Sequence, residues 1–230
     1  MRIVSLVPSL TETLDDWGRP PIAGTRFCAR AGLARVGGTK DPDLEAIAAL
    51  EPDLVVLDEE ENRREDYEAL LERGLAVYAC AVRSLGDLEG ALAGLADAVG
   101  VNWSVPAWPP TPPVRLRAVV PIWRRPWIAL GGPTYATSLL GAVGVANVLA
   151  DRGAYPRLEL AAMADARPDV VLAPSEPYPF AERHRRELEA VAPVVLVDGR
   201  DLFWWGSRTP GALARLGDDV ARWANLATRS

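Results

Sequence analysis

The chain repeats one pattern of apolar and polar positions. Residues 44–60 read LEAIAALEPDLVVLDEE, and residues 160–176 read LAAMADARPDVVLAPSE. In each copy a helical apolar pattern stops at a Pro-Asp pair, an apolar strand follows at once, and an acid, Glu60 or Glu176, stands at the same offset. A helix leading directly into a strand is typical of α/β units. The repeat therefore predicts two similar lobes, and two lobes predict a ligand cleft between them.

The pattern outside the repeat extends both lobes. Apolar runs predict strands at Ile3–Val7, Ile22–Gly24, Leu54–Leu57, Ala76–Cys80, Ala118–Ile122, Trp127–Leu130, Val170–Leu172 and Val194–Val197. Helical periodicity and caps predict helices from Ser9 or Thr11 to Trp17, from Asp41 or Asp43 through Leu44–Leu50, and at Arg64–Arg73, Ser84–Val99, Thr134–Val143, Leu158–Ala166, Glu182–Val191 and Pro210–Leu226. Asp198–Arg208 is predicted to be a long loop. Alternating strands and helices predict an α/β fold of two Rossmann-like lobes with mostly parallel sheets.

One segment separates the lobes. Val105–Pro113 reads VPAWPPTPP, and so many prolines exclude a helix or a central strand. The sequence therefore predicts an N-terminal lobe over residues 1–83, a connecting helix and proline-rich linker over 84–116, and a C-terminal lobe over 117–230.

Charge and hydropathy restrict the partners. The net charge is −6 and the isoelectric point is about 5.0, so nucleic acid is excluded as a partner, because phosphate binding needs a basic surface. No apolar run is long enough to insert into a membrane. Met1-Arg2 leads into a short apolar strand, so we expect a cytoplasmic protein as written, or a periplasmic or extracellular one if the N-terminus is trimmed. Cys28 and Cys80 are expected to be free thiols.

Ligands of open α/β sheets bind beyond the carboxyl ends of the strands. The loops expected there contain aromatic rings, hydroxyls and a few charges, which suit a bulky, partly planar ligand. The candidate ligand-binding residues are Ser9, Arg26, Phe27, Cys28, Lys40, Glu60 and Asn62 in the first lobe, and Trp123, Tyr135, Glu176, Tyr178, Trp204, Trp205, Ser207 and Arg208 in the second.

Groups for catalysis or metal binding are scarce. The single histidine, His184, lies in the charged segment ERHRRELE and is expected to be a solvated surface residue. One histidine and two distant cysteines do not form a zinc or iron site. Asp58–Glu61 is either a carboxylate metal site or, more commonly, a solvated helix entry. Cys28 is either a nucleophile activated by nearby arginines or a packed thiol. We therefore expect no enzyme activity, no metal and no resident cofactor.

The Trp204-Trp205 pair also has two interpretations. One ring packs inward while the other covers the edge of its lobe, or at least one ring lies at the mouth of the cleft. Gly206-Ser207 favours a close approach of the backbone to another group.

Several stretches together resemble a known family. RIVSLVPSLTETL, RVGGTKDPDLEAIAALEPDLVVLDEEENR, LAPSEPYPFAERH and VDGRDLFWWGSRTP are similar to the helical-backbone substrate-binding proteins of ABC importers, in the branch of the vitamin B12-binding proteins. The resemblance implies two Rossmann-like lobes joined by a helix, with a corrinoid or another metal chelate bound between them. It also implies that Glu60 and Glu176 dock on an ABC permease.

Three hypotheses follow. The first is a non-catalytic binding protein for a bulky small molecule, resembling periplasmic receptors for cobalamin and metal chelates. The second is an exported importer component whose signal is missing from this sequence. The third is a cytoplasmic enzyme or regulatory module that uses the same fold, with Cys28 and Asp58–Glu61 as its reactive groups.

Overall fold

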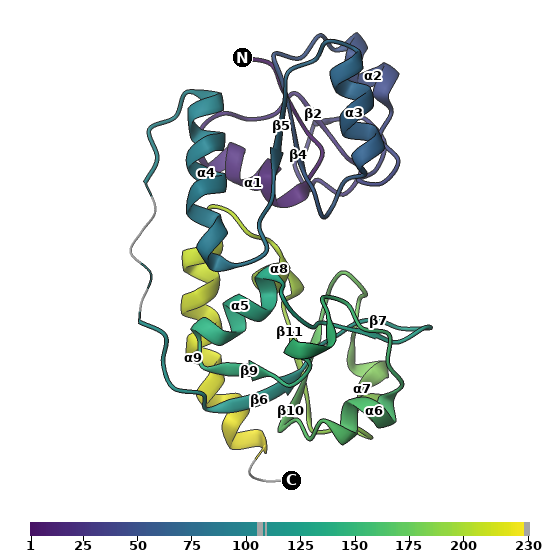
Figure 1. Ribbon diagram of the computed structural model, residues 1–230, viewed down its shortest axis with the longest axis vertical. Coiled ribbons are helices and arrows are strands. Elements are labelled where there is room, and N and C mark those ends of the chain that lie inside the picture. The colour runs from purple at the N-terminus through teal and green to yellow at the C-terminus, as the bar shows by residue number, and fades with distance from the viewer. Residues whose placement is uncertain (105–107, 109, 228–230) are drawn as a thin grey trace. The chain divides into compact units, whose positions relative to one another are not determined.

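The computed structural model describes residues 1–104, 108 and 110–227 (Figure 1). Four residues of the predicted proline-rich linker, 105–107 and 109, lie outside the described residues. Contacts divide the chain into two compact units. The first unit contains Met1–Val82, Gly86–Val105 and Trp205–Arg208, and the second contains Arg83–Leu85, Pro106–Trp204 and Thr209–Ser230. The domain boundaries expected from the sequence remain a prediction.

The first unit is built on a parallel sheet of five strands, in the order β3-β2-β1-β4-β5. The strands are β1 (Ile3–Ser5), β2 (Ala23–Gly24), β3 (Ala34–Arg35), β4 (Leu54–Asp58) and β5 (Val77–Cys80). The helices are α1 (Pro8–Asp16), α2 (Leu44–Ala49), α3 (Arg64–Glu72) and α4 (Leu85–Val99). In Figure 1, α2 and α3 lie on one face of this sheet, and α1 and α4 lie on the other.

The core of the first unit follows from this layering. A strand covered on both faces has no solvent side, so β4 is buried along its whole length. One face of the sheet packs against Ile47 of α2 and Leu70 of α3. The buried stripe of α4 consists of Leu88, Leu92, Leu95, Ala96 and Val99.

The second unit is built on a parallel sheet of four strands, in the order β11-β10-β6-β9, with an antiparallel pair β7-β8 beside it. The strands are β6 (Leu116–Val119), β7 (Pro121–Trp123), β8 (Ile128–Ala129), β9 (Val145–Asn147), β10 (Val170–Pro174) and β11 (Val194–Val197). The helices are α5 (Tyr135–Ala142), η1 (Ala150–Arg152), α6 (Leu160–Asp165), η2 (Glu182–His184), α7 (Arg185–Leu188), α8 (Gly199–Phe203) and α9 (Thr209–Ala227). Figure 1 shows α5 and α9 on one face of the sheet and α6 and α7 on the other. Met163 of α6 and Leu188 of α7 complete a core that includes Val171 and Ala173 of β10.

The sequence repeat corresponds to a repeated set of contacts. In the first unit, the Asp53 carboxylate accepts a hydrogen bond from the backbone N–H of Arg2, at 2.5 Å, just before β1. The Asp53 N–H donates to the Arg2 carbonyl, and the Arg2 guanidinium donates to the carbonyl of Leu50, at the end of α2. These bonds align β4 with β1, so that Leu54 pairs with Ile3.

The second unit repeats these contacts. The Asp169 carboxylate accepts from the Arg117 N–H at 2.7 Å, and the Asp169 N–H donates to the Arg117 carbonyl. The Arg117 guanidinium reaches the carbonyls of Ala166 and Arg167, where α6 ends. Orphan carbonyls at a helix end need such donors. We call each set the Pro-Asp clamp, formed by Arg2 with Asp53 and by Arg117 with Asp169.

The predicted α/β class with parallel sheets is confirmed, and several local predictions are wrong. Val7 begins α1 without a side-chain cap, so neither Ser9 nor Thr11 caps it, whereas Asp43 does cap α2. The predicted loop Asp198–Arg208 contains α8, because the Asp198 side chain caps that helix. The short strands β3 and β9 were not predicted, because two or three residues are too few to show the alternation of apolar and polar positions that indicates a strand. Glu182–Val191 contains a 3-10 turn and one turn of α-helix rather than one continuous helix.

Among the described residues, no helix is both long and apolar enough to cross a membrane.

The Pro-Asp clamps predict matched effects on stability. Asp53→Ala and Asp169→Ala each remove the acceptor for a backbone N–H, so each is expected to lower the free energy of unfolding by about 1 kcal/mol in urea titrations. Asp165→Ala, which removes an exposed carboxylate at the end of α6, is the control and is expected to change it by less than about 0.5 kcal/mol. If only one of the two substitutions lowers the free energy of unfolding, the two clamps do not contribute equally to stability.

Candidate functional site

The loop after β4 is held by its own polar groups. Asp58 Oδ1 accepts hydrogen bonds from the backbone N–H of Glu60, at 2.8 Å, and of Glu61, at 3.0 Å. Asn62 Oδ1 accepts from the Asp58 N–H, and Asn62 Nδ2 donates to the Thr39 carbonyl. Asp58 and Asn62 are buried, while Glu60 and Glu61 are exposed. The buried pair therefore fixes a turn that presents the acids to solvent.

Burial has the largest effect on the pKa values of the two titratable groups beneath this turn, Asp58 and Cys80. Removal from water raises the pKa of the Asp58 carboxyl to about 7, although the two backbone N–H groups lower it. Cys80 is the register partner of Asp58 at the end of β5. Burial and the neighbouring Asp58 raise the pKa of the Cys80 thiol, so Cys80 is a protonated, packed thiol.

The cations on these loops already have partners within the unit. The Arg26 guanidinium forms two hydrogen bonds with the Asp41 carboxylate, at 3.1 and 2.9 Å. Lys40 Nζ donates to the Glu60 carbonyl at 2.7 Å. The Phe27 ring is 55% exposed, and the Arg26 guanidinium lies 5.0 Å from its centroid. This edge therefore presents one aromatic ring among exposed charges.

Cys28 is a packed thiol. It is 1% exposed, and its Sγ accepts a hydrogen bond from the Thr11 hydroxyl at 3.1 Å and lies 3.4 Å from that of Thr25. Hydroxyl neighbours solvate a thiol but do not remove its proton. The single histidine belongs to the other unit. These neighbours therefore provide no general base for a nucleophilic Cys28.

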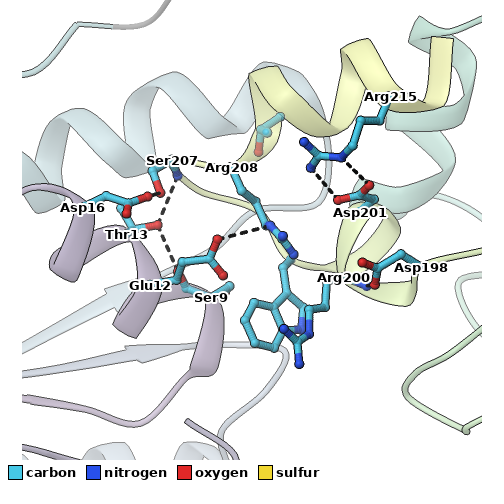
Figure 2. Close-up of polar contacts among 12 residues, drawn as sticks. Ser9, Glu12, Thr13, Asp16, Asp198, Arg200, Asp201, Ser207, Arg208 and Arg215 are labelled. Atoms are coloured by element: carbon cyan, nitrogen blue, oxygen red, sulfur yellow. Dashed lines mark hydrogen bonds and ion pairs between the residues drawn. The ribbon is translucent and has the colours of Figure 1, made fainter. Parts of the chain in front are cut away.

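Residues Trp205–Arg208 form what we call the strap, a segment that packs on α1. The Ser207 hydroxyl donates to the Asp16 carboxylate at 2.6 Å, and its N–H donates to the Thr13 hydroxyl at 3.1 Å (Figure 2). Arg208 Nε lies 3.3 Å from a Glu12 carboxylate oxygen. Gly206 has φ +137°, and a Cβ there would collide with the Thr13 hydroxyl, so glycine is required. Trp205 is buried. Ser9 lies in α1, and its carbonyl accepts a hydrogen bond from the Thr13 hydroxyl.

In the second unit, α8 holds the carboxylate of Glu176. Trp204 Nε1 donates to it at 2.8 Å, and Arg200 Nε lies 3.4 Å away. Gly199 permits this approach, because a Cβ there would lie 2.6 Å from the backbone of Glu176. The loop also borders an open hollow of about 640 Å³ that is lined by residues including Ser175, Glu176, Phe180, Asp198 and Arg200.

An aromatic group lies beside this loop. Trp123, at the end of β7, is 44% exposed and meets Tyr178 edge-on at 5.7 Å. Tyr178 contacts Phe180 at 4.7 Å, and Phe180 stacks on Trp127 at 6.1 Å. The inner rings are buried core, so Trp123 and the half-buried Tyr178 are the rings available to a ligand.

The expectation that His184 is a solvated surface residue is wrong. It is 5% exposed, and its Nδ1 accepts a hydrogen bond from the Ala181 N–H at 3.1 Å. Burial lowers the pKa of its imidazole, and the nearby charges of Arg183 and Arg124 lower it further. The 3-10 turn η2 directs His184 toward Tyr178 and Phe180.

The structure brings some candidate residues together and separates others. Lys40, Glu60 and Asn62 share one turn network, and Glu176 contacts Trp204 within its unit. Tyr135 is buried, and its hydroxyl lies 2.9 Å from that of Thr209, so it packs α5 against α9. A role in ligand contact remains a prediction for every candidate.

Sequence reasoning missed several polar residues. These are Glu12, Thr13 and Asp16 under the strap, Arg200 beside Glu176, Arg124 and His184 near Tyr178, and the Asp201–Arg215 ion pair at 2.7 Å, also drawn in Figure 2. Helical spacing was the available signal for the first three, since residues 9, 12, 13 and 16 share one face of α1. Within the described residues, no group of three or more His, Cys, Asp or Glu side chains could hold a metal ion.

The buried Asp58 carboxyl predicts how stability depends on pH. Its folded pKa lies above the usual 3.8, so the folded state favours the protonated form, and stability is lost as pH rises from about 4 to about 7. Asp58→Asn keeps the acceptor oxygen and removes the charge. It is expected to match the wild type near pH 4 and to exceed it by a few kcal/mol, roughly 1.4 per pKa unit, above pH 7 in urea titrations. Glu72→Gln, at an exposed position of α3, is the control. A difference between Asp58→Asn and wild type that does not vary with pH would contradict the assignment.

Comparisons with known proteins establish the fold. No family model and no curated protein sequence matches the chain. The periplasmic vitamin B12-binding protein of Vibrio cholerae is 18% identical over 100% of this chain and 98% of its own, with a TM-score of 0.77. The periplasmic haem-binding protein of Roseiflexus sp. RS-1 is 20% identical over 97% and 98%, with a TM-score of 0.75. A periplasmic haem-binding protein of Pseudomonas aeruginosa is 19% identical over 95% and 92%, with a TM-score of 0.77. The chain thus has the fold of the two-lobed binding proteins to which its sequence was likened.

Proposed function

We propose that this protein is a non-catalytic receptor for a bulky small molecule, and that it delivers this ligand to an ABC importer. The observation that carries the proposal is the fold, which is shared over nearly the whole length of binding proteins named for vitamin B12 and haem. The exposed rings Phe27 and Trp123 support it, because each lies next to the end of a strand, where α/β proteins bind ligands. The buried Cys28 thiol favours a receptor over an enzyme.

The ligand class follows from ring area and charge. A tetrapyrrole-like chelate offers a flat face to Trp123 and Tyr178. At the edge of the first sheet, the turn after β4 carries three consecutive exposed acids, Glu59, Glu60 and Glu61. The exposed cations of the neighbouring loops, Arg26, Arg35 and Lys40, are engaged within the unit. We therefore propose a neutral or cationic corrinoid rather than haem, which carries two propionate groups.

The structural neighbours are named as periplasmic proteins, and we propose that this protein also acts outside the cytoplasm. Reading the DNA upstream of the coding sequence for an export signal, and fractionating cells of the source, tests the location. Recovery of the protein only from the cytoplasm would count against it.

Titration with three chelates tests the ligand class. Quenching of tryptophan fluorescence is expected with cobinamide and cyanocobalamin at micromolar levels, and haem is expected to bind at least about fivefold more weakly, because each unfavourable charge contact costs about 1 kcal/mol. Glu60→Lys is expected to narrow this gap, while Glu72→Lys on α3 leaves it unchanged. Tighter binding of haem than of cobinamide would overturn the charge argument, and no quenching by any of the three would overturn the chelate receptor.

Docking on a permease is the second part of the proposal. Glu60 and Glu176 occupy matching places in the repeat, and the Glu176 carboxylate is held in position by Trp204 and Arg200. Fixed carboxylates suit the guanidinium groups of a partner. The docking partner would be an ABC permease, and a permease gene next to that of this protein would identify it.

Reconstituting that permease in liposomes tests the docking. Glu60→Ala and Glu176→Ala each remove one proposed charged contact with the permease. Each is therefore expected to reduce the ATP hydrolysis that this protein stimulates by about fivefold or more. The exposed acid Glu72 provides the control substitution, Glu72→Ala. Full stimulation by the double variant Glu60→Ala, Glu176→Ala would remove both residues from the interface.

A further inference from the structure

His184 is the only histidine of the chain, and the proposed function does not yet use it. It ends the 3-10 turn η2, directly after the loop 175–181 that contains Glu176 and Tyr178. Both of these residues belong to the proposed ligand and docking sites. A buried titratable group at this place can control the loop.

The hydrogen bonds of His184 determine where its proton lies. Nδ1 accepts from the Ala181 N–H at 3.1 Å, so in the neutral ring the proton is on Nε2. Nε2 lies 3.5 Å from the Tyr178 hydroxyl, which then acts as the acceptor. One imidazole thus bonds to both the end of the loop and its aromatic residue.

The packing around His184 makes this arrangement specific. Its ring meets Tyr178 at 5.5 Å and Phe180 at 5.6 Å, both edge-on. The positive charge of Arg124 lies near Tyr178 and His184, and Arg124 bonds the Glu187 carboxylate at 2.8 Å. The charged and titratable groups that act on the imidazole are therefore Tyr178, Arg124, Arg183 and Glu187.

We propose that His184 is a positioning residue whose neutral imidazole holds the loop 175–181 and orients Tyr178, so that protonation of His184 releases the loop and weakens ligand binding there. A protonated ring carries N–H on both nitrogens. Nδ1–H then faces the Ala181 N–H, and two donors cannot bond. The bond that closes the loop is lost. The part of this inference that concerns ligand binding rests on the proposed function.

The expected pH range follows from the surroundings. Burial lowers the pKa of His184, the positive charges of Arg183 and Arg124 lower it further, and Glu187 opposes them. The folded pKa therefore lies below that of the unfolded chain, about 6.5, and the stability that the neutral ring provides is lost as pH falls below that value.

Nuclear magnetic resonance on the full chain tests the proposal without any ligand. A single histidine gives a single imidazole resonance, whose titration yields the pKa directly. As that resonance titrates, the hydrogen-exchange protection of the Ala181 amide is expected to fall about tenfold or more between about pH 7.5 and pH 5. The Leu149 amide, bonded at 3.0 Å to the side chain of Asn147, which lies outside the loop, is the control and should keep its protection.

Two variants separate titration from packing. In His184→Asn the amide oxygen replaces Nδ1 as an acceptor and cannot be protonated, so protection at Ala181 should not change with pH. In His184→Phe the ring is kept and the acceptor is lost, so protection at Ala181 should be low at every pH. If protection in wild type and in His184→Asn depends on pH in the same way, the proposal is wrong.

Ligand binding provides the second measurement. The dissociation constant for cobinamide is expected to rise at least about fivefold from pH 7.5 to pH 5 in wild type and to stay constant in His184→Asn, matching a loop that is released in only one of them. Equal rises in both proteins would refute the coupling to ligand binding. If cobinamide binds at neither pH, the corrinoid proposal fails, and the exchange measurement at Ala181 still decides the role of His184.

Discussion

The architecture depends on the Pro-Asp clamp. In each unit an aspartate carboxylate accepts a hydrogen bond from the backbone N–H of an arginine, Arg2 just before β1 or Arg117 within β6. The guanidinium of the same arginine bonds a carbonyl at the end of α2 or α6. These contacts fix the register of the central parallel pair, β4 with β1 and β10 with β6. A slip of one residue would turn every apolar side chain of a strand to the opposite face. One small set of polar contacts thus sets which residues form the core.

The same register determines where the loops begin. Because parallel strands end at one edge, the turn after β4 and the loop after β10 start at equivalent places, and Glu60 and Glu176 inherit equivalent positions. The two loops are then stabilised differently. Buried Asp58 and Asn62 hold the first from within, whereas α8 and His184 hold the second from outside. A common scaffold therefore supports a polar edge in one unit and an aromatic edge in the other.

The parts that could be predicted from the sequence are those encoded by local patterns. The repeat, the fold class and a cap of α2 by Asp41 or Asp43, of which the structure shows Asp43, are each visible within a few residues. The roles of Arg2 and Arg117 could not be predicted, because the carboxylates that they contact lie about 50 positions away in the chain. His184 was misjudged because charged neighbours suggest a surface helix, whereas a 3-10 turn points its ring inward. The contact between Tyr135 and Thr209 could not be predicted either, because 74 positions separate the two residues in the chain.

The strap makes the two units interleaved in sequence. Trp205–Arg208 belongs to the first unit, although α8 precedes it and α9 follows it in the second. No continuous stretch of the chain therefore contains all of the first unit without most of the second. A gene fragment ending at residue 104 would encode α1 without the backbone that covers Thr13 and without the hydroxyl bonded to Asp16. During synthesis, the first unit can be completed only after Arg208, and with it almost all of the second unit before the start of α9, has left the ribosome.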